Sequence, residues 1–514
     1  MLRDPEPNVF HYSKFNLEAL CCRASALRHG GVPCVCTPDQ RPASGSFNWA
    51  IFIVFTDGIR WVLRSPHPRT FMPLEMAMKS LASEATTLRY LRAHSDIPVP
   101  IVYDYCASSD NDIGIPFILM SEAPGWPLSK AWKPAGSPQR DLDTSIKARI
   151  LTQLGGITWK LSRLRFEKVG SLFEEEGSFQ LKGCLSRGHI LHERYDLETS
   201  RGPFTSEAEF WDSLISAFLG HAEALPLSHH CFVAPVPSPE DYQAGMQYKS
   251  AVSLWNDFVT VGGKIDSSQN RLDYIIVGDA LRDILHSGQL PAIVPETFPL
   301  CHADLSVNNI YVDDDYNITC IIDWAFSSSI PESMLLAAPG LPQYRDEISS
   351  ELHTSFIDGF VAAMPDSADK SLIQRYRESL DRAHVAWRLS RLLSLDSIAD
   401  YDLFATMWHF TRGPEADLAQ YILQQRYSPR YVQLYQELQK EDQQPSKIEK
   451  DEKNYFHDKD LRYTIAKKLT IMSEWKTQYT ADDPPTLLRK DIFVADPKLW
   501  KWILKFMRDW EDIR

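Results

Sequence analysis

Apolar side chains in the first 123 residues follow the periodicities of strands and helices, with strands in the majority. Three short runs are rich in β-branched and aromatic residues, which is typical of buried strands. The first two runs are separated by a turn in which the pair Asp57-Gly58 favours a hairpin. A fourth segment carries apolar residues three and four positions apart, as a helix does. We therefore expect strands at 47–55, 60–64 and 115–120 and a helix at 79–93.

Helical periodicity dominates after Gly125, and only one hairpin is expected there, at residues 308–323. This change divides the chain into a small strand-rich domain at 1–123 and a larger, mainly helical domain at 124–436. The segments with apolar residues at helical spacing are 144–165, 206–225, 247–258 and 372–396.

The last part of the chain, residues 437–514, is expected to be an extension of the helical domain. It opens with a charged run at 437–453, which is typical of a solvated linker or helix end. Further on, Asp496 and Pro497 form a helix-start signal. We expect the apolar face of the helix that follows to pack on the body of the protein. That face is formed by Leu499, Trp502, Ile503, Phe506 and Trp510.

Composition and charge exclude several classes of protein. The 514-residue chain is 44% hydrophobic and 24% charged, as soluble globular proteins are. It has 54 Lys and Arg against 68 Asp and Glu, a formal net charge of −14, which disfavours binding to nucleic acid. The chain contains no run of 18 apolar residues, so no membrane-spanning helix is expected. The first residues lack the features of a signal or transit peptide, so the expected location is cytoplasmic.

The most informative segment is 300–331, in which polar residues flank a predicted hairpin. His302, Asp304 and Asn309 precede a short apolar strand, and Asp323 ends the strand that returns after an acidic turn. Because a hairpin brings its two ends together, Asn309 and Asp323 are expected to lie side by side. A carboxylate and an amide oxygen suit Mg²⁺. Asp304 is placed to accept a hydroxyl proton, which completes the set that phosphoryl transfer needs.

This segment resembles the catalytic core of the aminoglycoside phosphotransferase/choline kinase family, a branch of the protein-kinase-like fold. It is especially similar to the fungal phosphotransferase-enzyme family. The resemblance implies that Asp304 is the catalytic base, that His302 supports the loop, and that Asn309 and Asp323 bind Mg²⁺. Trp324 stands where protein kinases carry the Phe of Asp-Phe-Gly, and no Ala-Pro-Glu triplet follows. The missing triplet argues against a protein-kinase activation segment.

The same resemblance implies an α+β, bilobal protein-kinase-like fold. It has a small β-rich N-lobe and a large, mainly helical C-lobe with helical insertions. Ser44-Gly45-Ser46 resembles the family's reduced phosphate loop, in which backbone N–H groups cradle phosphate; an ordinary turn is the alternative. Arg64 occupies the strand position where most kinases place Lys. Glu84 lies at the edge of the apolar stripe of the predicted helix, where a carboxylate needs a cation. We expect Glu84 to pair with Arg64, and a surface Glu is the alternative.

Residues 117–123 resemble the strand that runs into the hinge between the two lobes of such enzymes. The resemblance implies that Met120 lines the base pocket, and plain core packing is the other interpretation. It also implies that backbone groups near Glu122 and Ala123 form hydrogen bonds with adenine.

We therefore expect an enzyme that uses ATP and Mg²⁺ to transfer the γ-phosphoryl group to a hydroxyl of a small molecule. Its expected partner is that acceptor, with neither nucleic acid nor a membrane. A catalytically silent binding protein of the same fold and a protein kinase are the alternatives. The intact set of Asp304, Asn309 and Asp323 favours an enzyme, whereas Arg64 in place of Lys favours a silent protein. The sequence leaves open the acceptor, the choice between ATP and GTP, and the oligomeric state.

Overall fold

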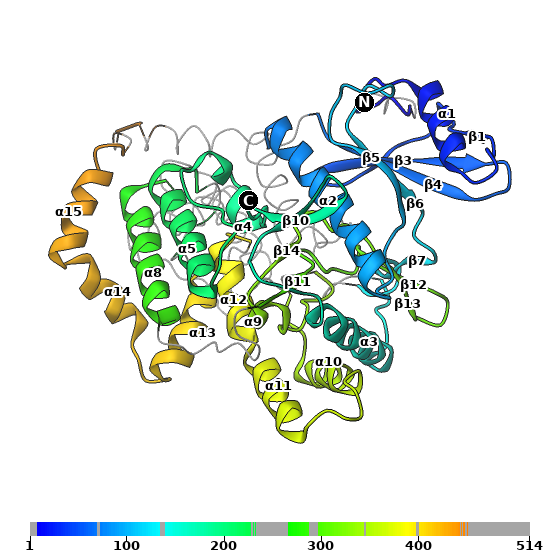
Figure 1. The fold of residues 1–514 in the computed structure, drawn as a ribbon. Coiled ribbons are helices and arrows are strands. Elements are labelled where there is room, and N and C mark those ends of the chain that lie inside the picture. Colours follow the sequence, from blue (N-terminus) through cyan, green and yellow to red (C-terminus); the bar gives the residue numbers. More distant parts are fainter. Residues whose placement is uncertain are drawn as a thin grey trace, which may run out of the picture.

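Figure 1 shows the fold of the chain as a computed structural model. It describes residues 8–68, 72–133, 139–227, 266–286, 297–343, 346–396 and 400–442, with single positions at 230, 232, 444, 446, 447 and 450. A strand-rich lobe and a larger helical lobe lie side by side, so the predicted α+β, bilobal kinase-like fold is confirmed.

The N-lobe is built around a six-stranded antiparallel sheet in the order β1-β3-β4-β6-β5, with β2 also paired to β3. The strands predicted at 47–55 and 60–64 are present as β3 and β4. The third predicted strand begins two residues later than expected, as β6. The bounds are β1 Cys34–Val35, β2 Ala43–Ser44, β3 Asn48–Phe55, β4 Arg60–Pro66, β5 Val102–Cys106 and β6 Phe117–Ser121.

Two helices, α1 (Leu17–Leu27) and α2 (Leu74–His94), cover opposite faces of this sheet. Side chains alternate between the two faces along a strand. On β4, Trp61 and Leu63 are therefore buried together with α1, whereas Arg64 lies on the side of α2. Helix α2 begins five residues before the predicted start at 79.

Two three-stranded sheets connect the N-lobe to the helices of the C-lobe. One has the order β13-β12-β7, and the other has the order β14-β11-β8. The chain enters the first sheet at Gly125, where φ is +87° and an added Cβ would lie 2.2 Å from the carbonyl oxygen of Val312. The strands are β7 Trp126–Pro127, β8 Arg165–Phe166, β11 Phe298–Cys301, β12 Ile310–Val312, β13 Ile318–Ile321 and β14 Ser328–Ser329.

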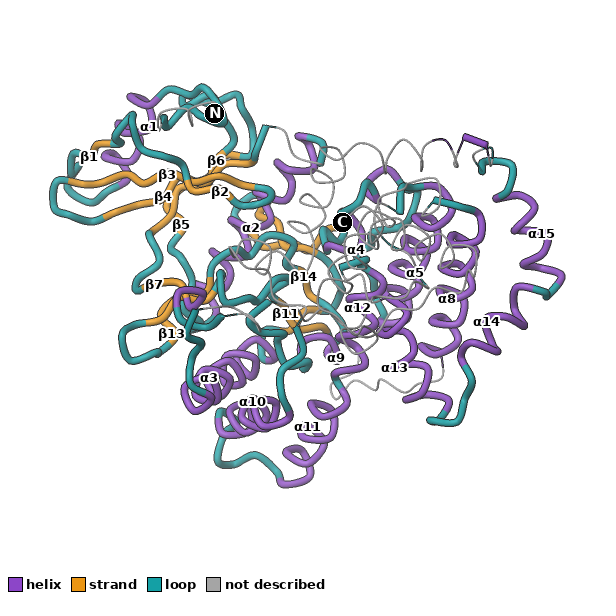
Figure 2. Tube along the Cα trace, turned by 180° about the vertical axis from the view of Figure 1, so that it is seen from behind, coloured by secondary structure: helices purple, strands orange, loops and turns teal. Residues whose placement is uncertain are grey.

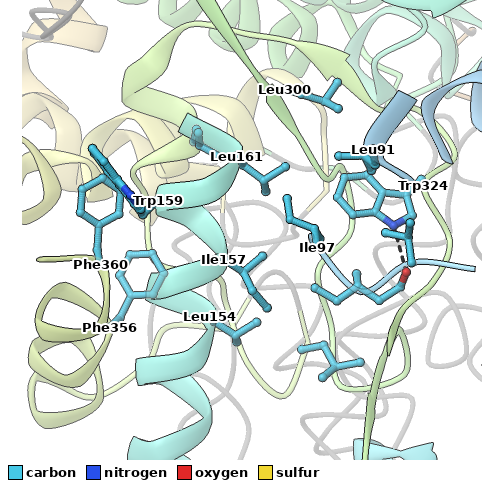
Figure 3. Close-up of a cluster of buried hydrophobic side chains, with 14 of the residues drawn as sticks. Leu91, Ile97, Leu154, Ile157, Trp159, Leu161, Leu300, Trp324, Phe356 and Phe360 are labelled. Carbon is cyan, nitrogen blue, oxygen red and sulfur yellow. Dashed lines mark hydrogen bonds between the residues drawn. The ribbon is translucent and has the colours of Figure 1, made fainter. Parts of the chain in front are cut away.

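A hydrophobic core joins the two lobes below these sheets. Figure 3 shows Leu91 and Ile97 from the N-lobe side facing Leu300 and Trp324. Helices α3 and α10 pack against each other at the base of the same core. The C-lobe helices on this side are α3 Thr144–Ser162, α9 Glu332–Leu335, α10 Ser350–Ala362 and α11 Lys370–Arg382.

A second helical group has its own core on the side of the C-lobe away from the N-lobe sheet, as Figures 1 and 2 show. It consists of α5 Glu207–Ala224, α8 Ser268–His286, α12 His384–Leu393, α13 Asp400–Arg412, α14 Leu418–Arg426 and α15 Pro429–Leu438. The short elements between α3 and α5 are β9 Ser171–Glu175, β10 Ser178–Lys182, α4 Arg187–Ile190 and the 3₁₀ turn Arg194–Asp196, and a further 3₁₀ turn is Leu128–Lys130.

Several predictions for this lobe need correction. The helix expected at 372–396 is two helices, because Tyr376 and Leu380 of α11 face the core of α3 whereas Leu389 of α12 faces that of α5. The hairpin at 308–323 is not alone, since β9 and β10 form another. The predicted helices at 144–165 and 206–225 are present as α3 and α5.

Two other predicted elements cannot be compared. The helix expected at 247–258 and the one after Pro497 both lie outside the described residues. Among the helices that are described, none combines the length and the apolar character needed to cross a bilayer.

Candidate active site

The loop between β11 and β12 is held by a buried histidine. His302 Nδ1 accepts a hydrogen bond from the backbone N–H of Asp304 (3.1 Å), and its Nε2 donates to the carbonyl oxygen of Ile322 (2.9 Å). This arrangement requires the neutral ring with its proton on Nε2. Burial lowers the pKa of His302 and so favours that form. The ring also packs edge-on against Trp324, with centroids 4.7 Å apart. His302 therefore ties the loop to the residue that precedes Asp323, as a supporting residue would.

Asp304 carries a carboxylate in which one oxygen has no hydrogen-bond partner among the described residues. Its Oδ1 is buried and accepts no hydrogen bond from the residues that the structure describes. Its Oδ2 lies 3.7 Å from Nη1 of Arg187. Burial raises the pKa of Asp304, while the positive charge of Arg187 opposes that rise. A carboxylate with a raised pKa and an oxygen that accepts no hydrogen bond is suited to accept a proton.

The hairpin of β12 and β13 brings Asn309 next to the segment that carries Asp323. Ile310 pairs with Ile321, and the N–H of Ile322 donates to the carbonyl oxygen of Asn309 (2.9 Å). The proximity expected from the hairpin is therefore present in the backbone. Asn309 Nδ2 donates to the carbonyl oxygen of Asp304 (2.8 Å), so the amide oxygen is the atom left for a ligand.

These donors fit a magnesium ion. Asp323 supplies a carboxylate and Asn309 an amide oxygen, and Mg²⁺ takes few protein ligands because phosphate and water complete its shell. The described residues contain no cluster of three or more His, Cys, Asp or Glu that would suit a metal held by protein alone.

Arg64 joins the two lobes through a buried ion-pair network. Its Nη1 lies 3.2 Å from Oε1 of Glu84 on α2, and its Nη2 donates to Oδ1 of Asp323. The predicted pairing of Arg64 with Glu84 is thus present, and the surface alternative for Glu84 is wrong because its side chain is only 3% exposed. Burial raises the pKa of Glu84 to about 7, although the charge of Arg64 opposes the rise. Burial also acts to raise the pKa of Asp323, but Arg64 outweighs it and the pKa is lowered.

The turn Ser44-Gly45-Ser46, which was expected to bind phosphate, forms hydrogen bonds with neighbouring residues of the same lobe. The N–H of Gly45 donates to the carbonyl oxygen of Asn48 (2.9 Å), and Ser44 Oγ lies 3.1 Å from Nε2 of His67. Ser46 is exposed at the tip. The next residue, Phe47, packs edge-on against Phe326 beyond Asp323, with centroids 5.2 Å apart. The amide of Gly45 is therefore engaged within an ordinary turn, and only the location beside the Asp323 segment matches the expectation.

The segment expected to form the hinge runs from β6 toward Gly125. Met120 is buried in the core shared by the two lobes, which agrees with core packing, and its role in a base pocket stays a prediction. The side chain of Glu122 lies 3.0 Å from Nη1 of Arg60, and its N–H donates to the carbonyl oxygen of Arg60 (3.4 Å). Ala123 is half-buried at the end of this segment. The backbone of Glu122 is thus partly used within the sheet.

Arg187 is a site residue that the sequence analysis missed. It lies on α4, where it contacts Asp304 at 3.7 Å and Asp396 at 3.2 Å. No motif surrounds it, and it comes from a four-residue helix between two longer segments. The signal that could have pointed to Arg187 is its charge, because a site for phosphate transfer would need more than one cation.

Fold and site together define a protein of the kinase-like class. A β-rich lobe with a buried Arg–Glu pair meets a helical lobe whose loops carry Asp304, Asn309 and Asp323. Residues 40–228 match the model of the phosphotransferase enzyme family. The resemblance to that family is confirmed by this match, which includes Arg64, Glu84 and Arg187 and ends before the loop at 302–309.

Several known proteins are similar to the chain. It is 25% identical over 369 residues to a subtelomeric hrmA-associated cluster protein of Aspergillus fumigatus, covering 67% of this chain and 66% of that protein. It is 30% identical over 95 residues to the mitochondrial protein named altered inheritance of mitochondria protein 9 of Scheffersomyces stipitis, covering 18% of this chain and 15% of that protein. The chain thus spans less than two thirds of the length of these relatives.

Solved structures also align with the chain. One is a putative fructosamine-3-kinase from Thermobifida fusca, with 13% identity and a TM-score of 0.39, covering 77% of this chain and 99% of that one. Another is an ethanolamine kinase of Plasmodium vivax, with 14% identity and a TM-score of 0.36, covering 77% and 83%.

Proposed function

We propose that the protein is an ATP- and Mg²⁺-dependent phosphotransferase that acts on a hydroxyl of a small molecule. The observation that carries the proposal is the buried Oδ1 of Asp304, which has no hydrogen-bond partner among the described residues, on a loop where Asn309 donates through Nδ2 to the carbonyl oxygen of Asp304. The family match over residues 40–228 supports phosphotransferase activity in the broad sense.

In the proposed reaction the acceptor oxygen attacks the γ-phosphorus of ATP. A new bond forms between that oxygen and phosphorus, and the bond to the β–γ bridging oxygen breaks with its electron pair remaining on ADP. Asp304 takes the proton of the hydroxyl at Oδ1. Arg64 supplies positive charge on the nucleotide side, fixed by Glu84. Bound Mg²⁺, held by Asn309 and Asp323, would neutralise charge on the phosphate oxygens.

The expected domain division and the expected location and partners also remain proposals. The three-part division at 1–123, 124–436 and 437–514 follows the change from strands to helices, although α15 runs to Leu438. A cytoplasmic location and the absence of nucleic-acid partners rest on composition and a net charge of −14.

The decisive experiment separates binding from transfer in an Asp304→Asn variant. We expect it to retain stabilisation by Mg²⁺ and ATP in thermal unfolding. Its rate of ADP release should be about 10²–10⁴-fold lower than that of wild type. The rate is measured with water and with a panel of hydroxylated amines and sugars as acceptors. Because the pKa of Asp304 is raised, the wild-type rate should fall as the pH drops, with a midpoint above that of an ordinary carboxyl.

The matched control is Asp315→Asn, which changes an exposed carboxylate in the turn of the same hairpin. It should behave as wild type. Equal ADP release from wild type and Asp304→Asn would refute the role of the base. Nucleotide binding without ADP release in wild type would identify a silent binding protein, and labelling of a protein panel would identify a protein kinase.

A further inference from the structure

Arg187 stands between the base and a second, more deeply buried carboxylate. Its Nη2 lies 3.2 Å from Oδ1 of Asp396, within hydrogen-bond distance, and Asp396 is only 9% exposed. Its Nη1 lies 3.7 Å from Oδ2 of Asp304, which is longer than a hydrogen bond. The guanidinium therefore lies between the two carboxylates and is closer to Asp396 than to Asp304.

The backbone that carries Arg187 is fixed by its neighbours on both sides. His189 is fully buried, with Nδ1 2.7 Å from Ser186 Oγ and Nε2 3.0 Å from Ser213 Oγ. Gly188 packs so closely on α5 that an added Cβ would lie 2.5 Å from Cδ1 of Leu214. A cation on such a support loses little freedom when it binds a ligand, which is the condition for preorganised charge stabilisation.

The two segments that carry Asp304 and Asp323 supply no positive side chain of their own. The loop 302–309 and the segment 322–331 contain no Lys or Arg. Arg64 is already shared between Glu84 and Asp323. The charge of Arg187 acts to lower the pKa of both Asp304 and Asp323, so it lies within electrostatic reach of the base and of the proposed metal ligand.

We propose that Arg187 is a further catalytic residue, which binds the γ-phosphoryl group as it moves from ADP to the acceptor, and that Asp396 is its positioning residue. This proposal rests on the proposed function. The guanidinium hydrogen-bonds the oxygens of the phosphoryl group, where Arg binds two oxygens in a forked geometry. Arg187 takes part in no covalent change: the acceptor oxygen gains the bond to phosphorus, ADP keeps the electron pair, and Asp304 takes the proton.

The test compares the affinity of two Mg²⁺ complexes, ADP and the non-hydrolysable β,γ-imido analogue of ATP, measured by calorimetry. Only the analogue carries the γ-phosphoryl group. We expect Arg187→Gln to bind ADP as wild type does and to bind the analogue about tenfold more weakly, the size of one charged hydrogen bond. Arg187→Lys, which keeps the charge and guards against loss of folding, should show a smaller loss.

A double-mutant cycle separates contact from charge screening, because loss of Arg187 also exposes the phosphate to Asp304. In the Asp304→Asn background that repulsion is absent. If Arg187 contacts the phosphoryl group, Arg187→Gln still weakens binding of the analogue there. If the effect disappears in that background, Arg187 only screens Asp304 and the proposal is wrong.

Asp396→Asn should shift the ratio of the two affinities in the same direction by a smaller factor, a readout that a purely structural role would leave unchanged. Arg388→Gln, on α12 and paired with the exposed Glu347, is the control and should leave the ratio unchanged. Equal analogue binding by wild type and Arg187→Gln would overturn the proposal alone. Failure of wild type to bind either nucleotide would overturn the proposed function as well.

Discussion

Arg64 is the residue on which the junction of the two lobes depends most. Its side chain is 11% exposed and contacts both Glu84 and Asp323. Removing one partner of a buried ion pair leaves the other charge without compensation, at a cost of about 3–5 kcal/mol. We therefore expect Arg64→Met to lower the free energy of unfolding by about that amount, as measured by urea denaturation with circular dichroism.

The same strand offers a matched control for this prediction. Arg60 lies on β4 with its side chain 43% exposed and paired with Glu122, and such surface pairs contribute about 0–1 kcal/mol. Arg60→Met should therefore have little effect, and equal losses in the two variants would contradict the buried role of Arg64.

The loss of stability in the Arg64→Met variant should also depend on pH. In the wild type, the charge of Arg64 opposes the rise that burial causes in the pKa of Glu84, and the variant lacks that charge. A carboxyl with a raised folded-state pKa stabilises the protein at low pH and loses that contribution as the pH rises through the raised value. The destabilisation of Arg64→Met should thus be larger at pH 8 than at pH 5.

At this scale the sequence predicted contacts that follow from periodicity and missed those that follow from topology. The pairing of Arg64 with Glu84 could be predicted because each residue lies on a regular element with one buried face. Arg187 could not be placed, because the helix that carries it has four residues and no periodic pattern. Arg187 and Asp304 are separated by 116 intervening residues of chain, whose path no local rule constrains.

Among the elements, the segment between β6 and β7 leaves little room for a larger side chain. Gly125 has φ +87°, and an added Cβ would lie 2.2 Å from the carbonyl oxygen of Val312 on β12. A non-Gly residue in this left-handed region costs about 1–2 kcal/mol, and overpacking adds about 1–3 kcal/mol. We expect Gly125→Ala to lower the free energy of unfolding by about 3 kcal/mol, as measured by chemical denaturation.

Gly114 provides the comparison, because its φ is +86° but nothing lies within 4 Å of an added Cβ. Gly114→Ala should cost only the backbone term of about 1–2 kcal/mol. The difference between the two variants then reports the close approach of the linking segment to β12. Equal losses would mean that the segment moves away at little cost.

Elements with a one-sided apolar pattern were predicted, and those without one were not. Strands β3 and β4 and helix α5 have alternating or striped burial and were found in the sequence. The hairpin of β9 and β10 is largely exposed along its second strand, so its sequence lacks that alternation. The single helix predicted at 372–396 shows the opposite failure, since two helices facing different cores produce one continuous apolar pattern.

In the molecule as a whole, burial lowers the pKa of three histidines that lie in α4, directly after it and in α5. His189 is fully buried and His221 nearly so, and burial, aided by the charge of Arg194, lowers the pKa of both, to about 3 and about 2. Burial also lowers the pKa of His192 to about 3. The whole arrangement of α4, α5 and α12 around Arg194 therefore excludes protons that the unfolded chain would bind near pH 6.5.

The sign of the resulting pH dependence follows from these directions. A histidine whose folded-state pKa is lowered stabilises the protein above its unfolded pKa, and the contribution is lost as the pH falls toward the folded value. Between about pH 6 and pH 4, each such residue adds up to about 1.4 kcal/mol per pH unit to the slope of stability against pH. We expect His189→Gln, which can keep a hydrogen bond to Ser186 or Ser213, to reduce that slope by about one proton. The measurement is the free energy of unfolding by urea at a series of pH values, with the exposed His29→Gln as control. A slope that is the same in wild type and His189→Gln would show that His189 is protonated in the folded protein, and hence that this core admits a charge.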